Sequence, residues 1–249
     1  MTGTSHSTTG PRRRALSAVA FAILCAGLIA GGIVSSAGAT SAKVLGKTKH
    51  TPPPACPKDT ASDPCSAVGR VTAFMRIADG EKFPFQVRRN GKIVAYALDL
   101  SRPNQKQRSF FGKIFKSHRF GKAPTARLAV IKQNRQNRKK YKLLRQSPTV
   151  NLSGALGRKE LFTLDKPLRI RKGQTVALTV PTWVSNFGLK NVSSAGNQWR
   201  ASRKKGECNT SKIPIAKKSK PQQKVGSIRR YDCDYTGARL LYWAYYVPD

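Results

Sequence analysis

Over Pro167–Pro181, apolar and polar residues alternate with the two-residue period of a half-buried β-strand. The apolar positions are Leu168 and Ile170 in the first run and Val176, Leu178 and Val180 in the second. A turn at residues 172–174 separates the runs. If they pair as a hairpin, this three-residue loop places Ile170 on the same side as Val176. If they belong to opposite sheets of a sandwich, they form an arch and do not pair.

Shorter segments of the same kind occur along the rest of the chain. Strands are expected over residues 71–77, 83–87, 92–100, 126–131, 140–144, 149–152, 160–164 and 239–247. In residues 92–100, strict alternation places Ile93, Ala95 and Ala97 on one face and Val94, Tyr96 and Leu98 on the other.

One segment, residues 101–120, breaks the strand pattern. Phe111, Ile114 and Phe115 fall at helical spacing among lysines and arginines, which predicts one short amphipathic helix. Its phenylalanines either cover the open end of a sandwich or touch a membrane surface. With no alternation of strands and helices, the predicted fold is all-β: an antiparallel β-sandwich, jelly-roll-like, with one short helical insertion.

The first 39 residues have the order of a secretory signal peptide. A polar start ending in three arginines precedes an apolar run, Ala15–Val34, and the small residues Ala37-Gly38-Ala39 form a cleavage site. An uncleaved membrane anchor is the alternative, and of the two possible contacts with a membrane, this segment and the amphipathic helix, we expect only this one. Either interpretation places the body outside the cytoplasm, secreted or associated with the cell envelope. Residues 40–66 are expected to be a mostly disordered, Pro/Lys/Thr-rich linker and residues 67–249 one domain.

Four cysteines remain after the signal peptide, and an even number in an exported chain predicts two disulfides. Of the three connectivities, we favour Cys56 with Cys65 and Cys208 with Cys233, because each pair closes a short polar loop. A metal site would need cysteines at paired spacings with further cysteine or histidine neighbours, and these four cysteines have neither. We therefore expect no metal or other cofactor.

The charge is strongly one-sided. Lysine and arginine number 47 against 11 aspartates and glutamates, a formal net charge of +36. Between Asp99 and Glu160 there is no acidic residue but 17 basic ones. A mixed-sign surface would keep a protein soluble with less self-repulsion, so this imbalance indicates an anionic partner.

Three segments of the chain are similar to segments of known exported proteins: GKIVAYALDLSRP, KAPTARLAVIK and PLRIRKGQTVALTVPTWV. Together they make the region from about residue 71 to 184 resemble uncharacterised exported β-sandwich proteins of actinobacteria. The resemblance implies a fold and a compartment, and no catalytic residues.

Few residues are available for catalysis. The predicted domain contains one histidine, His118, and no serine lies in a nucleophile-elbow sequence. The even cysteine count leaves no free thiol, and the scattered carboxylates are better suited to salt bridges. We therefore expect a non-enzymatic protein, with an envelope-acting hydrolase as the weaker alternative.

Binding to an anionic polymer requires only the basic loops and exposed aromatic rings that the sequence contains. The polymer would be a teichoic acid, an acidic polysaccharide or nucleic acid such as extracellular DNA. The expected contacts are Arg135, Arg138, Lys139 and Lys140 on one loop, Arg200, Arg203, Lys204 and Lys205 on another, with Trp183 and Trp199 as stacking candidates unless they pack in the core. A structural or adhesive protein–protein module remains an alternative.

Overall fold

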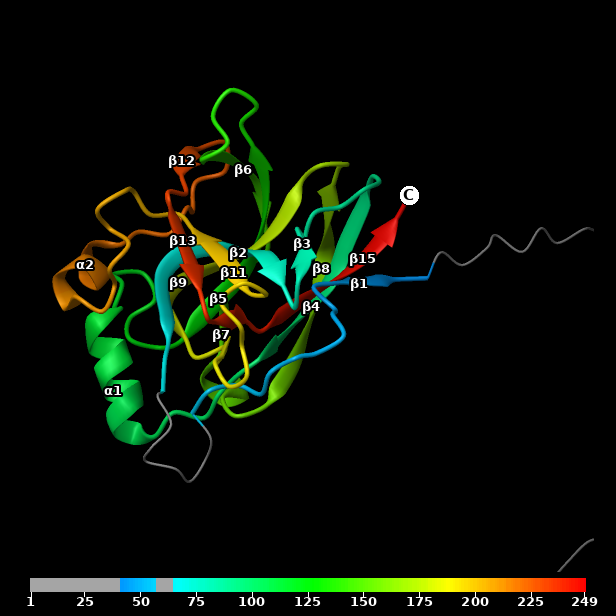
Figure 1. Cartoon of the computed structure of the whole chain (residues 1–249). Helices are drawn as coiled ribbons and strands as arrows, with labels where there is room; N and C mark the ends of the chain where they lie inside the picture. Colours follow the sequence, from blue (N-terminus) through cyan, green and yellow to red (C-terminus); the bar gives the residue numbers. More distant parts are fainter. Residues whose placement is uncertain (1–40, 57–64) are drawn as a thin grey trace, which may run out of the picture. The chain divides into compact units, whose positions relative to one another are not determined.

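The structure is a computed structural model of the 249-residue chain and describes residues 41–56 and 65–249. The predicted signal peptide lies outside the described residues. The fold is all-β, with antiparallel sheets and two α-helices among the described residues (Figure 1). The helices are α1 (Gln105–Ile114) and α2 (Ile213–Lys218), and Ser153–Ala155 form a 3-10 turn.

Fifteen strands in the described part of the chain form three antiparallel sheets. Across the four-stranded sheet the order is β1 (Lys43–Leu45), β15 (Tyr242–Pro248), β4 (Gly91–Asp99) and β8 (Lys159–Ile170). Across the nine-stranded sheet it is β12 (Ile228–Arg230), β6 (Lys140–Gln146), β5 (Thr125–Gln133), β9 (Thr175–Val184), β2 (Val68–Ala78), β11 (Gln198–Ala201) and β13 (Cys233–Thr236), with β3 (Glu81–Lys82) on β2 and β7 (Val150–Asn151) on β5. The third sheet pairs β10 (Phe187–Gly188) with β14 (Arg239–Leu240).

One large hydrophobic core joins the two main sheets. It includes Tyr96 of β4 and Tyr242 of β15 from the four-stranded sheet, and Leu128 of β5 and Leu178 of β9 from the nine-stranded sheet. The Phe85 ring stacks on Tyr242 at a centroid distance of 4.0 Å. Each large side chain buried in this way stabilises the fold by about 1.5–3 kcal/mol.

The stretch Pro167–Pro181 forms an arch, not a hairpin. Its first run belongs to β8 and pairs with β4, whereas its second run belongs to β9 and pairs with β2 and β5. Gly173 turns the chain with a φ of 78°, and its N–H donates to the carbonyl of Val87. Ile170 and Val176 therefore meet in the same core from opposite sheets.

The predicted alternation in β4 fails at one point. Ile93, Tyr96 and Leu98 all lie in the main core, whereas Ala97 packs in a separate cluster with Trp243. The pairing of β4 with β8 shifts register between Ile93 and Ala95. Such an irregularity reverses the faces of the residues that follow it, which a strict two-residue period cannot anticipate.

Residues 83–87 do not form the expected strand. They follow β3 as a turn with one isolated bridge, between Gln86 and Thr175. Phe85 and Val87 are nevertheless buried, at 1% and 2% exposure. The sequence pattern identified core positions here, but the chain reaches the core through a turn.

The predicted helix is confirmed as α1. The Asn104 side chain caps it by accepting from the N–H of Gln107, and the Gln107 side chain accepts from the N–H of Asn104. Phe111, Ile114 and Phe115 are buried against Trp183 of β9. Those three side chains therefore pack against the nine-stranded sheet.

Part of the expected linker is ordered. Residues 43–45 form β1, which pairs with β15 at the edge of the four-stranded sheet. The buried guanidinium of Arg239 donates to the carbonyls of Gly46 and His50. These contacts hold residues 43–50 against the domain, although the composition of this segment is typical of a flexible one.

The nine-stranded sheet curls strongly. Its two edge strands, β12 and β13, are separated in the chain by only Tyr231 and Asp232, so the edges must approach each other. A second core containing Phe74, Tyr141 and Tyr231 fills the curl. The Tyr141 and Tyr231 rings lie 4.8 Å apart, centroid to centroid.

Candidate functional site

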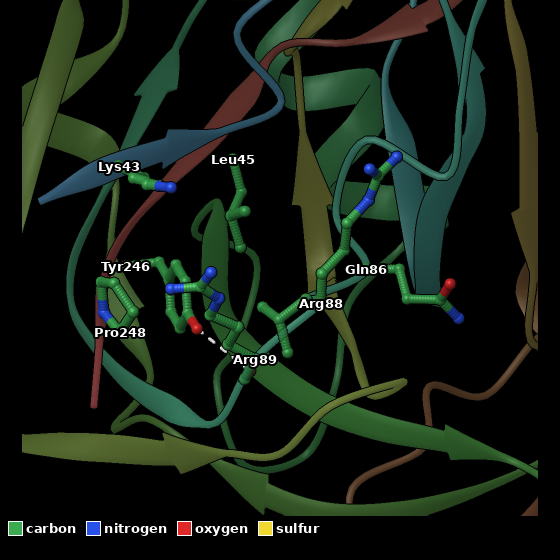
Figure 2. A pocket seen from close by; sticks show the side chains of 8 residues that line it. Lys43, Leu45, Gln86, Arg88, Arg89, Tyr246 and Pro248 are labelled. Atoms are coloured by element: carbon green, nitrogen blue, oxygen red, sulfur yellow. Dashed lines mark hydrogen bonds between the residues drawn. The ribbon is translucent and has the colours of Figure 1, made fainter.

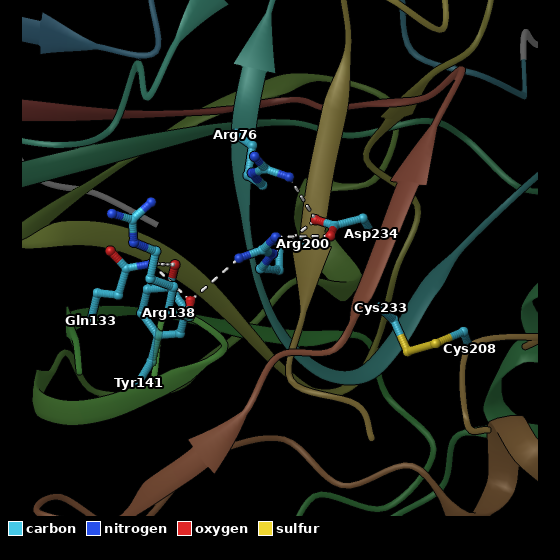
Figure 3. Close-up of polar contacts among 8 residues, drawn as sticks. All are labelled: Arg76, Gln133, Arg138, Tyr141, Arg200, Cys208, Cys233 and Asp234. Atoms are coloured by element: carbon cyan, nitrogen blue, oxygen red, sulfur yellow. Dashed lines mark hydrogen bonds and ion pairs between the residues drawn. A yellow bond between two sulfur atoms is a disulfide. The ribbon is translucent and has the colours of Figure 1, made fainter. Parts of the chain in front are cut away.

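Both predicted disulfides are present. Cys56 is bonded to Cys65, and Cys208 is bonded to Cys233. Disulfides are typical of proteins in oxidising, extracytoplasmic compartments. The second bond ties the start of a long basic segment, residues 208–233, to its end at β13 (Figure 3).

A buried glutamine holds that segment against the curled sheet. The backbone N–H of Gln222 donates to Oγ1 of Thr72 at 3.0 Å, and its Nε2 donates to the carbonyl of Tyr141 at 3.1 Å. Its Oε1 accepts from the Tyr231 hydroxyl at 2.8 Å. Because Gln222 is only 2% exposed, these bonds are shielded from solvent, and they fix the backbone that carries the neighbouring lysines.

The loop between β5 and β6 is exposed but ordered. Oδ1 of Asn134 accepts from the N–H groups of Gln136 and Asn137. These bonds shape a tight turn from which the side chains of Arg135, Arg138 and Lys139 project into solvent.

The two predicted basic loops meet at β12. Lys140 lies opposite Arg230 in the β6–β12 pairing, and the carbonyl of Lys139 accepts from the N–H of Tyr231 at 2.7 Å. From the other loop, the N–H of Lys205 donates to Oδ2 of Asp232. Two basic loops that are distant in the sequence therefore approach each other through their backbones, next to β12.

A cavity of about 610 Å³ opens beside this junction. Its basic lining residues are Arg70, Lys204, Lys220, Lys224, Arg229 and Arg230, and none of the lining residues is acidic. Arg230 forms an ion pair with Asp232, whereas no described carboxylate pairs with the three lysines. All three lysines are exposed, so their ammonium groups are available to an anion.

We define the basic surface by the exposed or half-exposed cations of these segments. They are Arg135, Arg138, Lys139, Lys140, Lys204, Lys205, Lys220, Lys224 and Arg230. Sequence reasoning missed the last three. The signal was the high basic content of residues 208–230, but only the fold shows that this segment lies beside the two loops.

Arg200 does not belong to this surface. It is 8% exposed, and its guanidinium binds the Asp234 carboxylate with two bonds of 2.8 Å (Figure 3). Arg76 donates to the same carboxylate at 3.3 Å. The expected exposure of Arg200 is wrong, because its side chain is buried and its charge is occupied by a bidentate ion pair.

Arg203 is also buried, at 3% exposure. Its guanidinium donates to the Ser219 hydroxyl, the Tyr235 hydroxyl and the Gly69 carbonyl. Burial lowers the pKa of Arg203. The side chain fastens Ser219, the C-cap of α2, to β2 and β13, so its expected exposure is also wrong.

The two tryptophans lie in the interior. Trp183 is 1% exposed and donates from Nε1 to the carbonyl of Lys122 at 2.8 Å. Trp199 is 5% exposed and stacks on Tyr235 at a centroid distance of 4.2 Å. Neither ring offers a free face to a ligand, so the core-packing alternative holds for both.

The Asp234 ion pairs predict a pH dependence of stability. Burial alone would raise the pKa of the Asp234 carboxyl, but Arg200 and Arg76 together lower it below its usual value. The unfolded carboxyl titrates near a pKa of about 3.9, so below that pH the unfolded state binds more protons and stability falls. Urea unfolding of wild type from pH 2 to 6 should show this loss, and Asp234→Asn should reduce it.

The matched control is Asp165→Asn, which removes an exposed carboxylate that forms no ion pair with a described residue. It should retain the wild-type dependence on pH. An unchanged dependence in Asp234→Asn would contradict the assignment.

The candidate catalytic histidine lies outside the basic surface as defined above. His118 is exposed in the turn closed by the Ser117–Gly121 bridge. Within residues 41–56 and 65–249, no three His, Cys, Asp or Glu side chains gather as a metal site. In the same residues, no helix has the length and hydropathy of a membrane span.

No protein-family model, curated protein or solved structure matches the chain.

Proposed function

We propose that this is an exported, non-enzymatic protein that binds anionic polymers of the cell envelope or its surroundings. Teichoic acid, acidic polysaccharide and extracellular DNA share the repeated negative charge that the basic surface suits. The architecture we infer is a jelly-roll-like β-sandwich, supported by the core shared between the four-stranded and nine-stranded sheets. Export is supported by the two disulfides and by the sequence of the first 39 residues.

The observation that carries the proposal is that the two basic loops meet next to β12, whose residues also line the acid-free cavity. Lys140 pairs with Arg230 of β12 and Lys139 accepts from Tyr231, whereas Lys205 donates to Asp232 and Lys204 lines the cavity. A polymer that lies across such a surface releases condensed counterions, and the affinity gained depends on the number of charges neutralised.

The buried bonds of Gln222 favour this function further. Lys220 and Lys224 lie two residues on either side of it, so the backbone that carries them is fixed before any ligand arrives. Less conformational freedom is then lost on binding than with a flexible basic tail. The formal net charge of +36 also attracts polyanions from a distance at low salt.

A triple variant tests the proposal: Lys204→Gln, Lys220→Gln and Lys224→Gln. Retention of the purified protein is measured on immobilised teichoic acid, acidic polysaccharide and duplex DNA as salt is raised. On DNA the slope of log affinity against log salt should fall by about 2–3, because each lost phosphate contact removes about 0.9. Affinity at low salt should fall about ten- to hundredfold.

The matched control removes the same charge elsewhere, with Gln at Lys47, Lys106 and Lys172, all exposed and outside the cavity lining. It should change the slope much less than the first triple variant. Equal losses in both variants would show that net charge alone drives binding. Absence of wild-type retention on all three polymers at low salt would overturn the proposed function.

A further inference from the structure

A second cationic cavity, of about 390 Å³, is built from elements that the basic surface does not use. Its walls are β1, the turn at residues 86–89 and the end of β15 (Figure 2). In Figure 1, β1 and the C-terminus lie at the opposite side of the view from α2 and β12. This cavity is therefore separate from the one beside Lys204 and Lys220.

Three cations line this cavity: Lys43, Arg88 and Arg89. All three are exposed, and none forms an ion pair with a described carboxylate. The cavity has no acidic lining residue, and the exposed C-terminal Asp249 is not part of the lining. Figure 2 shows the Arg89 guanidinium beside Tyr246, on the same side of Leu45 as Lys43, whereas the Arg88 guanidinium lies on the other side. Lys43 and Arg89 are therefore the pair placed to donate to one phosphate or carboxylate.

The remaining lining is largely apolar. The apolar lining residues are Leu45, Val87, Tyr246 and Pro248. In Figure 2, Leu45 lies with Lys43 and Tyr246 on one side and Arg88 on the other. Val87 and Tyr246 are buried, at 2% and 4% exposure. The Tyr246 hydroxyl contacts the carbonyls of Arg89 and Asn90, at 3.0 and 2.9 Å.

These contacts hold the cavity in shape without a ligand. Tyr246 ties the Arg89 backbone to β15, and the N–H of Gly173 donates to the Val87 carbonyl from the other side of the turn. The two arginines therefore project from a turn whose backbone is bonded on both sides. A preformed cavity of this volume suits a molecule of about one ring.

We propose that this cavity is a second binding site, for an oxyanion carried on a ring-shaped, partly apolar body, the chemistry of a phosphorylated or carboxylated sugar or aromatic. Lys43 and Arg89 bind the oxyanion, Arg88 adds positive charge at the edge of the cavity, and Leu45, Val87 and Pro248 contact the ring. The basic surface recognises repeated charge, whereas this site recognises one charge together with an apolar body.

The test uses three probes in calorimetric titrations of the purified protein. Phenyl phosphate carries both features, inorganic phosphate only the charge, and phenol only the ring. Phenyl phosphate should bind at least tenfold more tightly than either of the others. The double variant Arg88→Gln/Arg89→Gln should weaken phenyl phosphate at least tenfold and leave the melting temperature unchanged.

Two controls separate this site from general attraction to a basic protein and from the proposed function. Arg169→Gln/Arg171→Gln removes the same charge from exposed residues outside the lining and should leave phenyl phosphate affinity within twofold. The triple lysine variant of the basic surface should also bind phenyl phosphate normally. Equal affinity for phenyl phosphate and inorganic phosphate, or equal losses in the two arginine variants, would overturn the second site and leave polymer binding untouched.

Discussion

Replacement of Trp183 by alanine should lower the free energy of unfolding by about 3–5 kcal/mol, the usual cost of deleting a fully buried tryptophan. The ring is 1% exposed and packs against Phe111 of α1 at a centroid distance of 5.3 Å. Its Nε1 bond to the Lys122 carbonyl is lost as well. Because this cluster joins α1 to β9, α1 should loosen first, and denaturant unfolding followed by circular dichroism measures the loss.

Two further variants separate the contributions. Trp183→Phe keeps much of the apolar contact and removes the Nε1 donor, so it should cost less than the alanine variant but leave the Lys122 carbonyl without that partner. Phe110→Ala on the same helix removes a ring that is 52% exposed and should change stability by less than about 0.5 kcal/mol. If Phe110→Ala and Trp183→Ala lower the free energy of unfolding by the same amount, the conclusion that Trp183 holds α1 against the sheet is wrong.

Local patterns in the sequence predicted most of the strands. Expected strands at residues 71–77, 92–100, 126–131 and 140–144 lie in β2, β4, β5 and β6. The range 239–247, expected as one strand, is divided between β14 and β15, and β15 lies between β1 and β4. Alternation shows which residues point inward, so the best-patterned segments are also the best-predicted ones.

The same patterns say little about which strands pair. Pro167–Pro181 was equally compatible with a hairpin and an arch, since both place Ile170 and Val176 in the core. Its connection was decided by contacts distant in the sequence, with β4 for one run and β2 for the other. Long-range pairing of this kind leaves no trace in the period of a single segment.

The candidate site shows a related limit. Charge indicated an anionic partner and located two basic loops, but it did not distinguish exposed cations from buried ones. The Arg200 guanidinium is buried in an ion pair with Asp234 on the neighbouring strand. The Arg203 guanidinium is buried in hydrogen bonds to carbonyl and hydroxyl groups. Lys204 and Lys205 follow directly in the chain and remain exposed. Only the fold separates these neighbours, since their residue types are almost the same.

The segment between Cys208 and Cys233 connects stability with the proposed function. It contains α2, the buried Gln222 and β12, and it supplies Lys220 and Lys224 to the basic surface. Its ends are joined by the disulfide, and its middle is fixed to the sheet by Gln222. Loosening of this segment should therefore weaken polymer binding without removal of any charge.

Removal of this disulfide by Cys208→Ala/Cys233→Ala should lower the free energy of unfolding by about 2–4 kcal/mol. The bond spans 25 residues, and closure of a loop of that length removes about 3.5 kcal/mol of chain entropy from the unfolded state. Guanidinium unfolding without reductant measures the change. Polymer affinity should fall while its salt slope stays at the wild-type value, because every cation of the basic surface is still present.

Cys56→Ala/Cys65→Ala provides the comparison, since that bond spans only 9 residues. Closure of this shorter loop removes about 1 kcal/mol less chain entropy from the unfolded state than closure of the 208–233 loop. No residue of the basic surface lies between Cys56 and Cys65. Polymer affinity and salt slope should therefore both match wild type. A reduced slope in Cys208→Ala/Cys233→Ala would mean that cations had been lost from the contact and not merely loosened. Unchanged affinity in that variant would show that the basic surface does not depend on the order that the disulfide and Gln222 impose on residues 208–233.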